Sequence, residues 1–193
     1  DSNNLGQHND VSGGVHAQAR YARGAFAAAL AARVDHDPGY GTEVTPQVRV
    51  AYAAHAWGLH ASAGRAVRAP SYAERYFNAT LARPRGRDYG DPNLRAERAW
   101  NAEVGADLLP APGLALRATG FRRATDGLID FVRLPADTVF RAQNLLTVTV
   151  QGVEAEAEAT QGAARLMLAY TFLDVTSDAL PTGAQAKYVQ TNA

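Results

Sequence analysis

Arginine and tyrosine side chains concentrate in one long segment of the sequence, between residues 68 and 95. A guanidinium group offers forked donors that match carboxylates and other anionic groups, and tyrosine adds amphipathic contact area. The segment is therefore a candidate binding surface for an anionic ligand. Its candidate ligand-binding residues are Arg68, Tyr72, Arg75, Tyr76, Arg83, Arg85, Arg87 and Tyr89.

Two other sets of side chains could carry chemistry, but their spacing argues against it. The five histidines, at positions 8, 16, 36, 55 and 60, include no pair with the spacing of metal ligands. Glu154, Glu156 and Glu158 form an acidic ladder, in which a catalytic carboxylate pair is conceivable. Arg117 and Arg165 on the neighbouring segments instead predict cross-strand charge pairs. The sequence also lacks a phosphate-binding loop, a nucleophile elbow and a zinc-protease motif, so we expect no enzyme, no metal site and no cofactor.

Composition narrows the function classes further. Lys plus Arg and Asp plus Glu both number 19, so the neutral charge gives no reason to expect nucleic acid as a partner. The absence of cysteine excludes disulfides, thiolate zinc sites and cysteine nucleophiles. The longest apolar run, Ala25 to Ala32, is far shorter than the ~18 to 20 residues of a membrane-spanning helix.

Alternation of apolar and polar residues dominates the chain and predicts strands. We expect eight of them, at 13–23, 25–36, 46–55, 57–67, 96–109, 113–132, 140–160 and 163–174. Since no helix-length amphipathic segment separates them, the expected fold is all-β, an antiparallel up-and-down meander. The apolar parity changes at Gln151-Gly152, which predicts a β-bulge there.

The expected connections alternate between short and long. Arg23-Gly24, His55-Ala56, Pro110 to Pro112 and Gln161-Gly162 should be tight turns, whereas 37–45, 68–95, 133–139 and 175–190 should be long loops. This regularity is typical of outer-membrane barrels, whose turns are short on the periplasmic side and long outside. Two aromatic girdles would follow, with Tyr21, Phe26, Tyr52 and Trp57 near the turns and Trp100, Phe121, Tyr170 and Phe172 toward the loops.

Four segments between about 60 and 180 resemble, in order and spacing, the barrel motifs of TonB-dependent outer-membrane receptors. They are Gly64 to Phe77, with Arg68-Ala69-Pro70-Ser71; Tyr89 to Gly105, with Asp91-Pro92-Asn93 and Glu97; Phe121 to Phe131; and Asn144 onward, with Gly152-Val153-Glu154 and Ala169 to Asp174. Ala96 and Asp91 depart from the family's usual Pro and Asn. Locally, Pro70 should end a strand, Ser71 should cap a short helix, and Asp91-Pro92-Asn93 should form a turn.

The resemblance implies that residues 1–193 are part of a transmembrane barrel of about 22 strands, with the plug domain and the final strands absent. It implies a receptor in the outer membrane of a Gram-negative bacterium, surrounded by lipid, that takes up a scarce ligand. A ferric siderophore is the expected ligand, with cobalamin, haem, copper or a glycan as alternatives. TonB would act only through the absent plug. The arginine-rich loop would contact the ligand, or else shield the barrel rim or pair with lipopolysaccharide phosphates.

Two other readings remain open from the residues alone. A self-contained eight-stranded outer-membrane barrel, acting as an anchor or adhesin, predicts that the first and last strands pair. A soluble β-sheet binding protein predicts that a second layer buries the faces that carry Trp57 and Leu59, and Leu166 and Leu168.

Overall fold

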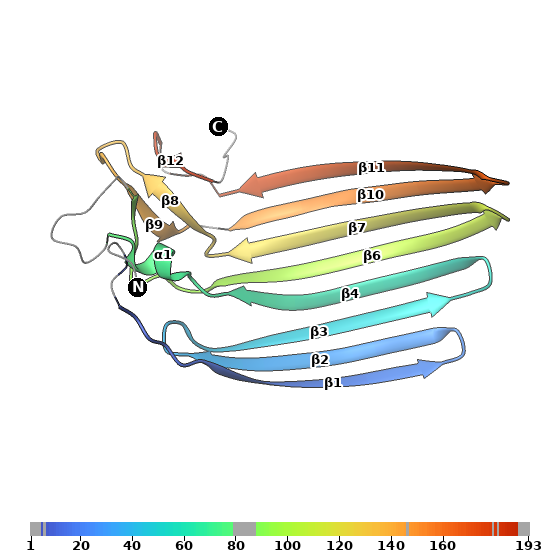
Figure 1. Cartoon of the computed structure of the whole chain (residues 1–193), viewed down its shortest axis with the longest axis horizontal. Helices are drawn as coiled ribbons and strands as arrows, with labels where there is room; N and C mark the ends of the chain where they lie inside the picture. Colours follow the sequence, from blue (N-terminus) through green and yellow to red (C-terminus); the bar gives the residue numbers. More distant parts are fainter. Residues whose placement is uncertain are drawn as a thin grey trace.

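The computed structural model describes residues 5, 7–78, 88–145, 147–178, 180 and 182–188. Its main feature is one antiparallel sheet of eight strands in the order β1-β2-β3-β4-β6-β7-β10-β11 (Figure 1). The strands are β1 (Gly13–Arg23), β2 (Phe26–Asp37), β3 (Gly41–Ala53), β4 (Trp57–Arg68), β6 (Glu97–Ala111), β7 (Leu114–Asp126), β10 (Val148–Gln161) and β11 (Ala164–Ser177). The all-β meander is therefore confirmed. Because β1 and β11 are the sheet edges and do not pair with each other, the described strands do not close into a barrel.

The connections differ at the two ends of the sheet. One end carries tight hairpin turns, in which Gly24, Gly113 and Gly162 have positive φ angles of 57°, 78° and 59°. The other end carries longer connections, with one exception. The expected long loop at 37–45 is wrong, because β2 runs to Asp37 and β3 begins at Gly41. Asp37 closes that turn by accepting hydrogen bonds from the Tyr40 and Gly39 amides, at 3.3 Å and 2.7 Å.

One face of the sheet is apolar and open. Trp57, Leu59 and Leu168 are 43%, 50% and 63% exposed, so in the described residues no second layer buries the face that the soluble-protein reading would cover. Trp100 and Phe172 lie on this outer face by register, opposite Ala124 and Val153. Phe121 does not, because it pairs with Glu103 on the polar face; its assignment to an outer aromatic girdle is wrong.

Two expected strands are each divided, and their outer parts form a second sheet. The segment 113–132 divides into β7 and β8 (Ile129–Arg133), and 140–160 into β9 (Phe140–Asn144) and β10. Together with β5 (Asp88–Tyr89) and β12 (Gln185–Ala186), β8 and β9 form the loop sheet, in the order β12-β8-β9-β5. The division needs a sharp bend, which Gly127 supplies with a φ of 66°.

The expected β-bulge at Gln151-Gly152 is also wrong. The register of β10 with both β7 and β11 runs unbroken through these residues. The apolar residues of β10 change faces there because Val148 and Val150 lie on the polar face, in the two rows that follow the row of Phe121 toward the loops. The one register irregularity among the main-sheet pairs falls between Leu108 and Ala111, beside the β6–β7 turn.

The buried core lies at the loop end. Leu94, Ile129 and Ala142 form a cluster of buried residues, against which Phe131 packs. The main sheet contributes little to this core because both of its faces are largely exposed. In the described part of the chain, no helix is long and apolar enough to cross a membrane.

Candidate functional site

The loop between β4 and β6 starts with the short helix α1 (Tyr72–Tyr76), and a charged network holds it in place. Ser71 and Glu74 form the expected cap as a reciprocal capping box. Arg68 donates to Glu74 at 3.0 Å and to Glu97 through Nε at 2.7 Å. Glu97, which is 4% exposed, also accepts the Ile129 amide at 2.8 Å and so connects this network to the loop sheet. Arg68 is thus paired twice and acts as a structural residue of the loop.

The Glu74 carboxylate is the titratable group of this helix cap. Partial burial would raise the pKa of Glu74, but hydrogen bonds from Arg68 and Ser71 outweigh it and lower the pKa below its ordinary value.

Gly90 brings the returning chain against α1, since its amide donates to the Phe77 carbonyl at 2.7 Å. A Cβ at Gly90 would lie 2.6 Å from the backbone carbon of Arg75. Only glycine allows this approach.

The aromatic residues of α1 stack against the N-terminal segment. The His8 ring lies 3.5 Å from the Tyr76 ring and 6.0 Å from the Tyr72 ring, both in stacked orientations. The Arg75 guanidinium lies 4.9 Å from the Tyr76 ring centre and 3.7 Å from Asp10. The structure thus brings Tyr72, Arg75 and Tyr76 together, with His8 as a partner that the sequence did not indicate.

Tyr89 lies apart from that stack, in the loop sheet. There the Arg141 guanidinium lies over its ring, 5.4 Å from the centre, because Tyr89 and Arg141 are register partners in β5 and β9. Arg141 was missed in the sequence, since only the strand pairing places it beside Tyr89. Arg83, Arg85 and Arg87 lie outside the described residues.

The loop sheet joins three separate loops, and the single lysine of the sequence connects two of them. Lys187 Nζ lies 2.5 Å from an Asp88 carboxylate oxygen, and this hydrogen bond raises the pKa of Lys187. Asp130, 1% exposed, accepts hydrogen bonds from the Phe131 and Tyr188 amides. The three loops at this end of the sheet therefore form one connected unit.

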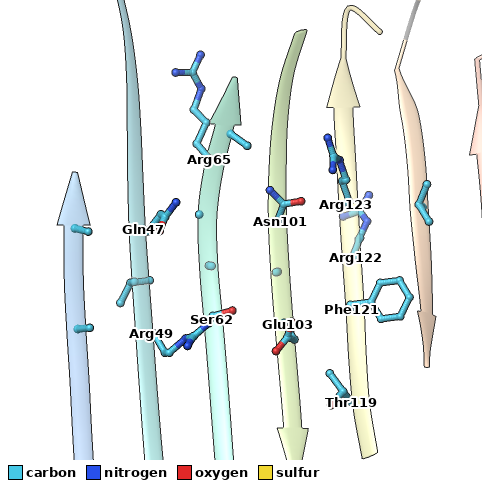
Figure 2. A pocket seen from close by; sticks show the side chains of 18 of the residues that line it. Gln47, Arg49, Ser62, Arg65, Asn101, Glu103, Thr119, Phe121, Arg122 and Arg123 are labelled. Carbon is cyan, nitrogen blue, oxygen red and sulfur yellow. The ribbon is translucent and has the colours of Figure 1, made fainter. Parts of the chain in front are cut away.

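Below these loops, the polar face of the main sheet contains a hollow of about 960 Å³. One row of register partners crosses it: Arg20, Ala29, Arg49, Ser62, Glu103, Phe121, Gly152 and Leu173. The next row toward the loops contains Gln18, Ala31, Gln47, Gly64, Asn101, Arg123 and Val150. Figure 2 shows Arg49 directed toward Ser62, and Arg123 on the far side of Asn101.

Between the hollow and the tight turns, the charged side chains of the polar face lie close to groups of opposite charge. Close to the turns, Arg165 pairs with Glu158 at 2.9 Å and Arg117 pairs with Glu156, as the acidic ladder predicted. His60 lies 3.7 Å from both Glu103 and Asp107. A carboxylate on this face is thus generally close to a basic side chain, and the described residues contain no group of three or more His, Cys, Asp or Glu that could hold a metal ion.

Comparison with known proteins agrees with this architecture. The TonB-dependent receptor-like β-barrel family model matches residues 2–192. The siderophore receptor PirA of Pseudomonas aeruginosa has a TM-score of 0.75 at 16% identity, over 88% of this chain and 35% of that chain. The ferric enterobactin receptor PfeA of the same organism, as a G324V mutant, has a TM-score of 0.72 at 19% identity, over 85% and 26%.

The FrpB iron transporter of Neisseria meningitidis has a TM-score of 0.64 at 20% identity, over 86% of this chain and 26% of that chain. The chain thus spans about a third or less of these three proteins. No curated protein sequence matches it. Because the family model covers nearly every residue, the chain belongs to the TonB-dependent receptor-like β-barrel family.

Proposed function

We propose that this chain forms part of the wall and external loops of a larger outer-membrane barrel, in a receptor that imports an anionic iron chelate. The observation that carries this proposal is the two-faced open sheet. Its outer face exposes residues such as Val104 and Leu168, 62% and 63% exposed, while the opposite face holds a polar hollow with arginines. This division of side chains suits the wall of a barrel that has lipid on its outer side and water on its inner side.

The solved relatives support the choice of ligand class. PirA is a siderophore receptor, and PfeA is a ferric enterobactin receptor. By analogy, a ferric siderophore is the proposed cargo, and uptake is proposed to draw energy from TonB through a plug outside this segment. The loop network around Arg68 and the loop sheet would shape the external entrance. No chemical step on the cargo is required.

Uptake of radiolabelled ferric siderophores by Gram-negative cells tests this function. We expect deletion of the gene to abolish uptake of one chelate from a panel of tris-catecholate, hydroxycarboxylate and trihydroxamate complexes. The complete gene should restore it, and inactivation of TonB should abolish it again. Equal uptake of every chelate with and without the gene would refute the proposed function.

A further inference from the structure

The main sheet divides between β3 and β4 in the part nearer the loops. The paired register of these two strands ends at Gln47–Gly64, although β3 extends to Gly41 and β4 to Arg68. Beyond that point each strand stays paired on its other side, β3 with β2 and β4 with β6. Figure 1 shows β3 and β4 moving apart toward the end of the sheet that carries α1. A split therefore separates two hydrogen-bonded units, one of β1 to β3 and one of β4 to β11.

Pro46 accounts for the end of the pairing. Its carbonyl oxygen lies 3.2 Å from the position of a Cβ on Gly64, so its backbone polar groups face β4. In an antiparallel pair the N–H and C=O of one residue bond to the same neighbour, and proline has no N–H to donate. Val44, two residues along β3, faces the same way. Its carbonyl accepts a hydrogen bond from the Arg65 guanidinium at 2.5 Å, so a side chain takes the place of a backbone partner on β4.

Glu43 makes the strongest contacts across the split. It is 6% exposed, and its carboxylate accepts Arg65 at 2.6 Å and Arg98 Nε at 2.9 Å. By register Glu43 belongs to the polar face, whereas Arg65 and Arg98 belong to the outer face with Trp100. In a continuous sheet the backbone would separate these faces, so the ion pairs pass through the split itself. One buried carboxylate of the first unit thus holds two guanidinium groups of the second.

The loop end of the split has a weaker contact. Arg75 of α1, which follows β4, reaches the β2–β3 turn of the other unit, where a Cβ on Gly39 would lie 2.3 Å from the Arg75 Nη1 atom. The ion pair of Arg75 with Asp10 is 3.7 Å long, beyond ordinary hydrogen-bond distance. A change in the width of the split would therefore move α1 relative to the β2–β3 turn.

We propose that the split is a hinged seam in the wall, in which Glu43 acts as a latch between the two units. When Glu43 releases Arg65 and Arg98, the units swing apart above Gln47–Gly64, and α1 separates from the β2–β3 turn. The continuous β3–β4 ladder below this point is the hinge. Because each unit keeps its own backbone pairing, opening breaks side-chain contacts alone. The loop end of the wall thus has one movable side. This inference goes beyond the proposed function and depends on no particular cargo.

A rigid brace would use the same three side chains differently. The curvature of the strands alone would then keep β3 and β4 apart at a fixed spacing, and the ion pairs would only fill the space between them. Loss of the Glu43 carboxylate would leave the strands where they are. A latch instead predicts that the strands separate further, and only above the last backbone pair.

The test measures distances between spin labels in the complete receptor in lipid vesicles, by double electron–electron resonance. Labels on Val44→Cys and Ala102→Cys report across the split. Labels on Val50→Cys and Val104→Cys join the same two strands, β3 and β6, across the continuous ladder. All four positions are exposed or partly exposed on the outer face. Because Glu43→Gln loses both charged pairs, we expect it to raise the open fraction tenfold or more, with the first distance longer by one strand spacing, about 5 Å.

Two further variants complete the design. Glu156→Gln removes an ion pair between β7 and β10, which stay paired along their backbones, so both distances should be unchanged. Arg98→Gln keeps the pair of Arg65 with Glu43 and should give an intermediate open fraction. Because Arg98 is more exposed than Glu43, this variant decides the question if Glu43→Gln does not fold.

Each result decides between a latch and a brace. A longer Val44–Ala102 distance with an unchanged Val50–Val104 distance supports the hinged seam. An unchanged Val44–Ala102 distance in the folded variants overturns it in favour of the brace. Equal lengthening of both distances also overturns it, because the wall then loosens without a hinge. Failure of both latch variants to fold overturns it as well, since the ion pairs are then required for the folded wall. None of these results depends on whether the receptor imports a siderophore.

Discussion

Replacing Glu97 by glutamine should loosen the loop sheet and leave the main sheet intact. Glu97 is 4% exposed, and its two oxygens accept Arg68 and the Ile129 amide. Glutamine keeps one acceptor for Ile129 but loses the charged pair with Arg68. A hydrogen bond to a charged group is worth about 1.5–3 kcal/mol. Because Arg68 is half-exposed and keeps Glu74 as a partner, we expect a loss of about 2 kcal/mol in the local opening free energy of the loop sheet.

Hydrogen–deuterium exchange of the complete receptor, followed by mass spectrometry, measures this loss directly. A change of about 2 kcal/mol corresponds to roughly 30-fold faster exchange in peptides from β8 and β9. Peptides from β10 and β11 in the same variant provide the internal control and should be unchanged. Glu156→Gln removes a more exposed ion pair with Arg117, so the local opening free energy should change by less than about 1 kcal/mol in this variant. Unchanged exchange in β8 and β9 of the Glu97 variant would refute the role of this carboxylate.

Three further predictions concern the loop and the two faces of the sheet. Since the folded pKa of Glu74 is below its ordinary 4.5, the stabilisation it gives α1 should be present above about pH 4.5 and be lost as the pH falls through the folded value. Amide protection factors in α1 measure this, and Glu74→Gln should remove the pH dependence. Gly90→Ala should increase proteolysis of the β4–β6 loop, whereas Gly13→Ala, with nothing within 4 Å of the new Cβ, should not. Val104→Arg on the outer face should destabilise folding into lipid vesicles by about 2–4 kcal/mol in urea titrations, whereas Asn101→Arg on the polar face should cost less than about 1 kcal/mol.

The sequence was sufficient for the main sheet because its apolar and polar residues alternate with the two-residue period of a strand, one kind on each face. It was less informative where a strand continues without a clear apolar face. The segment 37–45 was expected to be a long loop, because the alternation from Thr42 to Thr45 is too brief to show that β3 extends to Gly41. Gly127 divides 113–132, but a single glycine in an alternating run gives no sign that the next residues join another sheet.

The candidate site was only partly predictable for a related reason. Residue types identified the loop arginines, but their partners depend on pairing across the sheet. Arg68 is paired with Glu74 and Glu97, whereas Arg49 and Arg123 are without a carboxylate partner among the described residues. Arg20 and Arg49 are 29 positions apart in sequence, and only the register of β1, β2 and β3 places them in one row. Such rows cannot be read before the strand boundaries are known.

The stagger of the tight turns has a geometric consequence for a membrane-embedded barrel. The register row that starts at the β1–β2 turn, with Arg23 and Phe26, reaches β10 at Ala155 and β11 at Tyr170. The β10–β11 turn, at Gln161 and Ala164, lies six residues further along. Six residues span about 20 Å along a strand, and the two hairpins are six strand spacings apart, about 29 Å.

If all turns lie at one membrane surface, these lengths give a strand tilt of about 35° from the barrel axis, within the range of outer-membrane barrels. At this tilt Asp174, ten residues above Ala164, would lie about 27 Å from that surface, close to the ~25 Å height of the lipid-facing band. The polar outer row of Arg122, Gln151 and Asp174 then coincides with the opposite membrane boundary. With the turns at one surface, strand register thus sets the tilt of the wall and the thickness of the bilayer that the wall would fit.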